Sequence, residues 1–517
     1  MAKKETCFMK TKRFCDLRAE CSAETSLPDY NTDVRKILHV KASPHPISSF
    51  ASADGIECSG EVTFDVVYLD FEGDVCSASF SGDYGFTVKC DTGNYKDSLV
   101  ETALGALSLR LMSPRKIAAR ATLESSVTII TEETVTVEGD ALEAELNPEI
   151  RSDIHYLRTT AITPASEREY GVSLARFDGK TTDEVSLIHL SVSPVIERIA
   201  AEEGEAEVIG RINAIALIKS DEYPLHKIEK SIELSEKISL GDINGNSDLR
   251  AAIEVVSATV VTEGDEGGVE MMLNVITETR LVGEINTAAE LYSDVYLCEY
   301  PCECVSDGLG YEEYLGRWSA SREINETIPF STLGVGKLRE VIYADANVKV
   351  NGKELGDESA VIDGEISVSA IATEMNDDGG VEFVPLKFSV KFKENVNYDC
   401  QMDAKTALEE NITLTNLSAI VDSSSVYFKS VLNLEAALFS HREAEVLRTA
   451  KALFSEPYKK NPASVSVYYP MEGDTLYSIA KEYHTTREKL LADNPKAAET
   501  ISSNGEISNT LVRLIIT

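Results

Sequence analysis

Apolar and polar residues alternate along much of the chain, which is the pattern of β-strands that bury one face. The clearest case is the segment 61–68, Glu-Val-Thr-Phe-Asp-Val-Val-Tyr, in which every second residue from Val62 onward is apolar. A turn at 72–74 contains a glycine, and the chain then returns from Cys76 to Phe80. Glycine supplies the positive φ that a tight hairpin needs. We therefore expect an antiparallel hairpin here.

The same pattern recurs twice further along the chain, so the sequence contains an internal repeat. Residues 38–44 align without a gap to residues 188–194, and the alignment continues to Gly60 and Gly210. A third copy places Gly364 before a similar strand. The glycines lie about 150 residues apart, a spacing that suits whole domains rather than the turns of a solenoid.

The first and third copies also share an entry segment that the second copy lacks. Glu-Thr-Ser-Leu-Pro at 24–28 resembles Glu-Thr-Ile-Pro at 326–329. Apolar residues follow each proline at intervals of three, which predicts a short helical turn before a strand. A second strand pair closes each unit, most clearly in the second copy, where 255–261 and 271–276 flank a glycine-rich turn.

These elements predict a mainly β protein with three antiparallel repeat domains, each either a β-sandwich or a β-barrel. The predicted domains cover residues 16–145, 165–285 (the divergent copy) and 318–440, after an N-terminal segment of residues 1–15. Residues 441–465 are predicted to hold a helix and a linker. Ser440 and Glu443 have the spacing of a capping box, and apolar residues follow from Ala444 at helical intervals.

The last segment, residues 466–517, has the order strand, helix, helix, strand, and predicts a small α+β (βααβ) domain. Asp474 or Thr475 can cap the first helix, whose apolar face is formed by Leu476, Ile479, Ala480 and Tyr483. Thr485 or Thr486 starts the second helix, and Asn494-Pro495 ends it.

The charge of the chain excludes some classes of partner. The 517 residues carry a formal net charge of −38, spread along the chain. Nucleic acids and anionic lipids are therefore not expected as ligands, because both require clustered Lys and Arg. No run of about 18 apolar residues is present for a membrane span. The charged start lacks the apolar region of a signal peptide, so we expect a cytoplasmic protein.

No catalytic or metal site stands out, so we expect a non-enzymatic protein without a cofactor. Cys298, Cys302 and Cys304 are closely spaced, but no fourth ligand lies near them, and we interpret them as ordinary reduced thiols. The seven histidines form no metal-binding motif. His39 and His189 occupy the same position of the repeat, and we interpret them as structural.

The C-terminal residues resemble a LysM domain. The resemblance rests on Gly-Asp-Thr-Leu at 473–476, Ile-Ala at 479–480, the pair Thr485-Thr486 and Asn494-Pro495. It implies binding of N-acetylglucosamine-containing glycans in a shallow groove between the first of these turns and the loop after Asn494. That loop lacks the Pro and Gly usual in the family, so a protein ligand competes with a glycan.

The repeats resemble the SPOCS domain of clostridial spore-coat proteins, through Leu-Pro-Asp-Tyr at 27–30, 33–38 and Gly-Glu-Val at 60–62. SPOCS copies ahead of one LysM domain are similar to the SipL family of spore-coat morphogenetic proteins. This resemblance implies a scaffold on the outer forespore membrane, inside the mother cell, that tethers the coat. Its LysM domain would dock on the coat-basement ATPase, and other coat proteins are further expected partners.

The resemblance places the binding surface, for protein or glycan, on seven residues: Asp474, Thr475, Leu476, Ile479, Tyr483, Lys489 and Asn494. Each also has a structural interpretation. Leu476, Ile479 and Tyr483 fit the core of the domain, and Asp474 fits a helix cap. Thr475 and Asn494 are better contact candidates because exposed polar loop residues commonly serve recognition.

Overall fold

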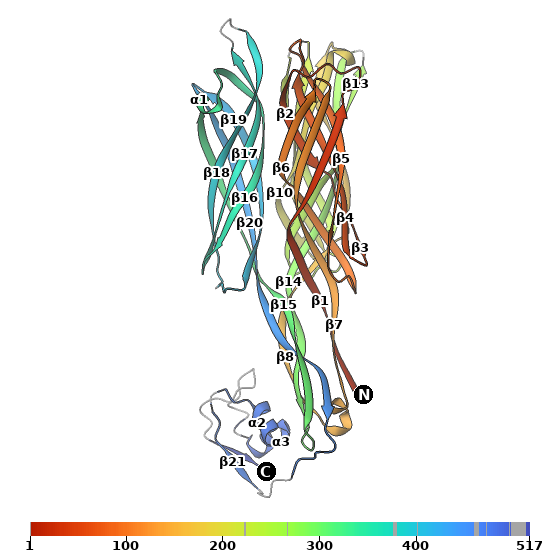
Figure 1. Cartoon of the computed structure of the whole chain (residues 1–517), viewed down its shortest axis with the longest axis vertical. Coiled ribbons are helices and arrows are strands. Elements are labelled where there is room, and N and C mark those ends of the chain that lie inside the picture. Colours follow the sequence, from red (N-terminus) through yellow and green to blue (C-terminus); the bar gives the residue numbers. More distant parts are fainter. Residues whose placement is uncertain are drawn as a thin grey trace.

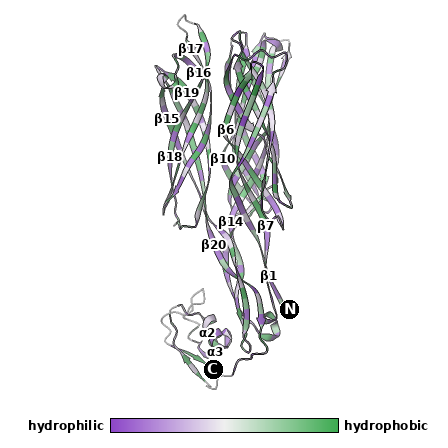
Figure 2. Ribbon diagram, viewed as in Figure 1, coloured by the Kyte–Doolittle hydropathy of each residue, from purple (hydrophilic) through white to green (hydrophobic). Residues whose placement is uncertain are grey.

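The structure of the chain is a computed structural model. It describes residues 2–221, 224–265, 267–375, 380–400, 402–459, 465–471, 473–495, 497 and 513–517. Three long β units stand beside one another, and their strands continue into a common stalk that carries a small helical module at its end (Figure 1). Hydrophobic and hydrophilic residues alternate along these strands (Figure 2), and the predicted mainly β fold is confirmed.

The first unit has two facing sheets. One contains β1 (Ala2–Ser26), β6 (Tyr95–Ser113) and β7 (Lys116–Gly139), and the other contains β2 (Lys36–Pro44), β3 (Ser48–Ser52), β4 (Gly55–Leu69) and β5 (Val75–Val88). Val62 and Phe64 of β4 pack against Ala121 and Leu123 of β7 between the sheets. Burial of this apolar face, at about 25 cal/mol for each Å² of apolar surface, holds the two sheets together.

The second unit repeats the arrangement after two 3-10 turns, η1 (Asp140–Leu142) and η2 (Ala144–Leu146). Its outer sheet contains β8 (Glu149–Ile162), β9 (Ser166–Asp178), β13 (Asp248–Asp265) and β14 (Gly268–Tyr296). Its inner sheet, which follows η3 (Thr182–Glu184), contains β10 (Val185–Glu202), β11 (Glu205–Ser220) and β12 (His226–Ser239). Because β9 and β8 pair with successive parts of β14, they are one strand interrupted near Pro164.

The third unit begins with β15 (Cys302–Pro329) and the short helix α1 (Phe330–Leu333). Its inner sheet contains β16 (Lys337–Leu355), β17 (Ser359–Met375) and β18 (Val381–Asn397). The hairpin of β19 (Thr406–Asp422) and β20 (Ser425–Ala452) closes the unit, and β20 also pairs with β15. Each unit therefore has a long first strand, an inner sheet and a closing hairpin, which is the repeat that the sequence predicts.

Two of the repeated glycines lie where neighbouring strands of the inner sheet approach closely, and a Cβ atom at the equivalent Gly60 would lie 2.9 Å from the Tyr84 ring. A Cβ atom at Gly210 would lie 2.2 Å from the carbonyl oxygen of Val195, and one at Gly364 would lie 2.4 Å from that of Lys349. Any larger residue would push the neighbouring strand away.

The three units contact one another head to tail and close a ring. Strand β10 of the second unit lies against β4 and β5 of the first, β16 of the third lies against β12 of the second, and β2 of the first lies against β17 and β18 of the third. Equivalent residues of the three copies meet at the centre. Leu38, Ile188 and Ile342 share one apolar cluster. Such cyclic, heterologous contacts are typical of a closed threefold assembly, here within one chain.

The centre of the ring also holds the two repeated histidines. The rings of His39, His189 and Tyr343 contact one another edge to face, with centroids 5.1–5.4 Å apart. Burial lowers the pKa of His39 to about 4 and holds the pKa of His189 well below its usual value. Both imidazoles are therefore neutral near pH 7, and both lie in a structural position.

The stalk forms because the first and last strands of every unit continue beyond the sandwiches (Figure 1). Apolar residues from all three ribbons pack together there, among them Val135, Leu291 and Val446. The units therefore extend further than the predicted domains. Residues 2–15 belong to β1, so the prediction of a separate N-terminal segment is wrong.

The helix predicted from Ala444 is also wrong, because β20 continues to Ala452 and pairs with β15. A bulge leaves Arg448 without a partner in the β15–β20 register, since Val305 pairs with Thr449 and Ser306 with Leu447. This extra residue shifts the alternation of buried positions by one. The buried residues then follow at spacings that imitate a helix. Part of the predicted linker falls within residues 460–464, which lie outside the described residues.

Candidate binding site

The C-terminal module contains β21 (Ser466–Tyr468), α2 (Leu476–Glu482), α3 (Arg487–Asp493) and β22 (Leu514–Ile516). The strands pair antiparallel, with Val467 opposite Ile515. Leu476 and Ile479 of α2 pack with Leu490 of α3 and with β22 in one buried cluster. The predicted strand, helix, helix, strand order is present in the described part of the module.

The turn before α2 is held by Asp474 and Thr475. The Asp474 carboxylate accepts hydrogen bonds from the Tyr468 hydroxyl at 2.9 Å and from the Met471 amide at 2.7 Å. The hydrogen bond to Asp474 raises the pKa of Tyr468 to about 12. The Thr475 hydroxyl caps α2 by accepting from the Ser478 amide at 3.0 Å, and the Ser478 hydroxyl accepts from the Thr475 amide at 2.9 Å. This reciprocal pair is a capping box.

The end of α3 is tied to β22 by Asn494. Its amide nitrogen donates to the carbonyl oxygens of Leu490 at 2.8 Å and Ile515 at 2.6 Å, and its amide oxygen accepts from the Ile515 amide at 2.7 Å. Lys489 donates to the carbonyl oxygen of Thr517 at 2.5 Å. Hydrogen bonds within the module therefore occupy both ends of the Asn494 side chain.

The structure brings the seven predicted site residues into one small module and gives each an internal role. Leu476 and Ile479 are buried, and Tyr483 packs at the edge of the core against Tyr468. The loop that should form the second wall of a glycan groove lies outside the described residues, apart from Ala497. Ligand binding by these seven residues stays a prediction.

One side of the module is attached to the stalk. The Tyr296 hydroxyl of β14 donates to the carbonyl oxygen of Thr485 at 2.9 Å, and its ring packs edge to face on Tyr477. Arg487 forms an ion pair of 2.7 Å with Glu149 of β8. The rings of Tyr458 and His484 stack at 3.5 Å. The helices α2 and α3 therefore face the stalk.

The outer face of the β21–β22 sheet is apolar and exposed. Tyr469 and Met471 are 65% and 69% exposed, and Val467 and its cross-strand neighbour Ile515 are also exposed. Because side chains alternate along a strand, Ser466 and Tyr468 point to the opposite face. We call Val467 and Ile515, together with the exposed residues Val465, Tyr469 and Met471 that flank β21 in the chain, the sheet strip. The alternation of apolar and polar residues around β21 can be seen in the sequence, whereas the exposure of this side of the sheet is seen only in the structure.

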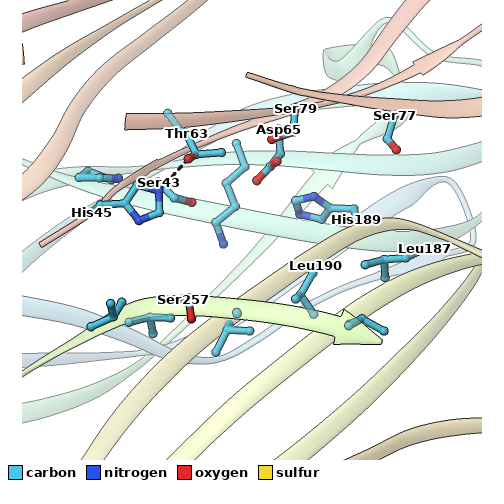
Figure 3. Close-up of a pocket in the computed structure, with 18 of the residues that line it drawn as sticks. Ser43, His45, Thr63, Asp65, Ser77, Ser79, Leu187, His189, Leu190 and Ser257 are labelled. Carbon is cyan, nitrogen blue, oxygen red and sulfur yellow. Dashed lines mark hydrogen bonds between the residues drawn. The ribbon is translucent and has the colours of Figure 1, made fainter. Parts of the chain in front are cut away.

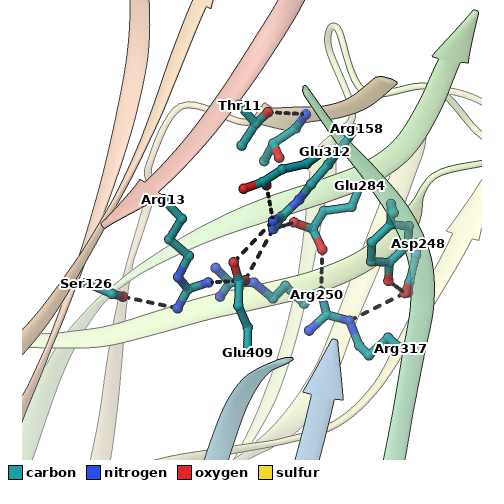
Figure 4. Close-up of polar contacts among 12 residues, drawn as sticks. Thr11, Arg13, Ser126, Arg158, Asp248, Arg250, Glu284, Glu312, Arg317 and Glu409 are labelled. Atoms are coloured by element: carbon teal, nitrogen blue, oxygen red, sulfur yellow. Dashed lines mark hydrogen bonds and ion pairs between the residues drawn. The ribbon is translucent and has the colours of Figure 1, made fainter. Parts of the chain in front are cut away.

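A buried ionic cluster joins the three units where they enter the stalk (Figure 4). Arg158 of the second unit is 2% exposed and pairs with Glu284 of its own unit and with Glu312 and Glu409 of the third. Arg13 of the first unit pairs with Glu409 at 2.7 Å. Burial alone would raise the pKa of Glu284, but Arg158 lowers it below its usual value. The paired charges give this cluster a structural role.

A cavity of about 740 Å³ lies between the first and second units (Figure 3). Its wall from the first unit is polar and includes Thr63, Asp65 and Ser79, whereas Leu187 and Leu190 of the second unit are apolar. Burial raises the pKa of Asp65. His45 and Thr63 share a hydrogen bond of 2.7 Å, so these two polar side chains of the wall satisfy each other's hydrogen-bonding capacity.

None of the groups of His, Cys, Asp and Glu described in the structure is arranged to hold a metal ion, and this includes the region of Cys298, Cys302 and Cys304. No helix within the described ranges has the length and apolar character needed to cross a membrane.

Comparison with protein families identifies a LysM domain at residues 472–507. The match covers the turn at Asp474, both helices and Asn494, and most of the loop that follows. No curated protein and no solved structure matches the chain. A LysM domain thus lies at the end of the stalk, after three β units.

Proposed function

We propose that this chain is a non-enzymatic assembly scaffold whose LysM domain docks on a protein. The sheet strip is the observation that carries the proposal. Val467 and Ile515 pair across the two-stranded sheet, and three more exposed apolar side chains flank β21 in the chain. Such a group is typical of the centre of a protein interface, which is poor in charge and rich in aromatic residues. The attachment of α2 and α3 to the stalk fixes the orientation of this face.

The hydrogen bonds of the polar site residues support the same choice. A sugar site needs polar groups with free hydrogen-bonding capacity. Asp474 and Asn494 already bond within the module, to Tyr468 and Met471 and to Leu490 and Ile515. Binding a sugar through the side-chain amide of Asn494 would break contacts that tie α3 to β22. Both bonds of Asp474 go to its Oδ2, so its Oδ1 keeps acceptor capacity.

The family resemblance supplies the biological setting of this proposal. By analogy with the SipL family, the partner of the LysM domain is the coat-basement ATPase of a sporulating cell. The chain would lie on the outer forespore membrane, on the mother-cell side, and tether coat layers there. The three β units would act as a rigid spacer and offer surfaces to other coat proteins.

The second candidate is a glycan-binding anchor of the cell wall or spore envelope. The LysM match itself favours it, because the turn at Gly473, Asp474 and Thr475 that forms one wall of a glycan groove is intact. In this case the sheet strip would play no part in binding.

Calorimetry with the full-length chain separates the two candidates. The titrants are the purified coat-basement ATPase and a pentamer of N-acetylglucosamine. The variant Val467→Thr with Tyr469→Ser removes apolar area from the sheet strip and keeps strand-forming residues at position 467. Val305→Thr, at an exposed position of β15, is the matched control.

For a protein-docking domain we expect ATPase binding that the double variant weakens at least tenfold, the loss of one hot spot or more, and that the control leaves unchanged. The proposal is refuted if the pentamer gives saturable heat, the ATPase does not bind, and the sheet-strip variant binds the pentamer as tightly as the original chain does.

A further inference from the structure

Two loops at the far end of the first unit display exposed aromatic side chains. Strand β1 runs out of the stalk to this end, where residues 27–35 connect it to β2, and residues 70–74 connect β4 to β5 (Figure 1). Tyr30 is 88% exposed and Phe71 is 65% exposed. The Arg35 amide donates to the carbonyl oxygen of Leu69 at 2.8 Å, so the two loops lie side by side.

The loop that carries Tyr30 is firmly held. Arg115 donates to the carbonyl oxygen of Pro28 at 2.7 Å, to that of Asn31 at 3.1 Å and to the Asp33 carboxylate at 2.9 Å. Backbone bonds of 2.8 Å join both ends of the loop to the turn between β6 and β7. The exposure of Tyr30 is therefore a property of a fixed backbone, and fixing it before binding removes an entropic cost of association.

The neighbouring turn is held in a similar way. The buried Asp70 carboxylate accepts from the amides of Glu72 at 2.9 Å and Asp74 at 2.8 Å. Phe71 lies between these anchored residues and still points away from the core.

The third unit shows that the fold does not need an aromatic residue at position 30. The Leu27 amide donates to the carbonyl oxygen of Arg115, and the Phe330 amide donates in the same way to that of Ser424, so Tyr30 corresponds to Leu333 in the structure. Leu333 packs against the core of the third unit. An exposed tyrosine on a rigid loop, at a place where another copy has a packed leucine, is typical of a recognition residue.

The charge around these side chains indicates the kind of partner. The two loops contain five carboxylates, at 29, 33, 70, 72 and 74, and one basic residue, Arg35. Arg35 is engaged with Glu382 of the third unit at 3.1 Å. Arg115 lies 2.9 Å from Asp33 and 3.9 Å from Asp29, and Lys219 lies 3.1 Å from Asp74. The five carboxylates still outnumber the three cations Arg35, Arg115 and Lys219, so the rim of the aromatic pair is acidic.

We propose that Tyr30 and Phe71, with the carboxylates beside them, form a docking surface for a protein whose own surface offers an apolar pocket bordered by Lys and Arg. Aromatic anchors in the centre of an interface supply binding energy, and complementary charge at its rim guides the partners together during association. This surface, which we call the distal platform, lies at the end opposite to the LysM domain. One chain can then connect two partners across the length of a β unit, whatever the LysM domain binds.

Selection from a random peptide library displayed on phage, with the immobilised full-length chain as bait, tests the proposal. The variant Tyr30→Ser serves for counter-selection, and because Tyr30 is 88% exposed this change removes little packing. Phe50→Ser, an exposed position of β3 in the same unit, is the matched control. Thermal unfolding of all variants checks that the fold is intact.

We expect the enriched peptides to combine an aromatic or large aliphatic residue with several Lys or Arg. A synthetic peptide from this set should bind the Tyr30→Ser variant at least tenfold more weakly, as for loss of a hot-spot residue, and the Phe50→Ser variant as tightly as the original chain. Raising NaCl from 0.05 to 0.5 M should weaken binding several-fold.

Three results would overturn the proposal. Enriched peptides without basic residues would contradict the charge argument. Equal affinity for the original chain and the Tyr30→Ser variant would remove the platform as the binding surface. Sedimentation showing a dimer of the full-length chain that Tyr30→Ser dissolves would replace the basic partner by a second copy. The LysM ligand does not enter any of these measurements, so they are independent of the function proposed above.

Discussion

Replacing Arg158 by methionine should destabilise the whole ring, because this one guanidinium neutralises carboxylates from two units. Its side chain is 1% exposed, and those of Glu284 and Glu409 are 5% and 7% exposed. Removing one partner of a buried ion pair costs about 3–5 kcal/mol, because the other charge is left buried and unpaired. Arg317 still lies 3.0 Å from Glu284, and Arg13 lies 2.7 Å from Glu409. We therefore expect the lower end, about 3 kcal/mol.

Urea unfolding measures this change, with tyrosine fluorescence and circular dichroism followed together because a chain of several units need not unfold in one step. The matched control is Arg120→Met. Arg120 pairs with Glu20 on the surface, where both side chains are more than half exposed, and such a pair contributes less than about 1 kcal/mol.

The pH dependence provides a second test with a defined sign. Arg158 helps to hold the pKa of Glu284 below its usual value, so this carboxylate stabilises the fold above its unfolded pKa and loses that contribution as the pH falls through its folded pKa. Without Arg158, burial favours a higher pKa of Glu284, and Arg317 is left to oppose it. The destabilisation caused by Arg158→Met should therefore shrink as the pH falls below about 4. A loss below about 1 kcal/mol at pH 7, or one that is the same at about pH 3, would refute this explanation of the cluster, since surface pairs give as much.

Three other variants probe different parts of the fold. Gly210→Ala places a Cβ atom 2.2 Å from the carbonyl oxygen of Val195 and should cost about 1–3 kcal/mol in urea unfolding, as for other overpacked sites; an unchanged midpoint would show that β10 moves freely. His39→Gln should reduce the stability that the protein loses as the pH falls from about 6.5 to 4. The folded state lowers the pKa of this imidazole to about 4, so the unfolded chain takes up the proton first. An identical pH profile of the variant contradicts the burial of a neutral ring. Tyr296→Ala removes the 2.9 Å bond to Thr485 and should detach the LysM domain, seen as a larger radius of gyration in X-ray scattering; an unchanged radius shows that the remaining contacts suffice.

The strand pattern and the repeat were predictable from the sequence because both depend on local order. Alternation around Phe64 identifies one buried face, and the repeated glycines at 210 and 364 mark the same close approach of strands in two copies. The helix predicted from Ala444 failed because a single bulge at Arg448 changes which residues are buried, and the bulge depends on the partner strand β15. Local spacing cannot reveal a partner more than one hundred residues away.

The candidate site likewise has a part that local sequence patterns predict and a part that depends on contacts between distant residues. The turn at Asp474 and the end of α3 at Asn494 were identified from residue types at short spacing, and the structure places both in the LysM domain. The contacts that orient the domain, such as that between Tyr296 and Thr485, join residues 189 positions apart. Tyr296 carries no motif, and only the packed stalk shows its role. The same is true of Tyr30, whose exposure depends on four hydrogen bonds from the distant Arg115.

Closure of the ring also decides how partner binding can be dissected. Because each unit contacts both others, deletion of residues 16–145 would expose the faces of β10 and β17 and leave half of β1 without β7. Arg158 would keep its three carboxylates, but Arg13, which stays in the chain, would lose the β7 strand that positions it beside Glu409. If such a deletion abolished binding of a partner protein, the cause could be the collapse of the ring or the removal of the binding surface, and the experiment would not distinguish them. Single exposed side chains such as Tyr30 and Val467 leave every contact between units in place, so changes at these positions assign binding to one surface.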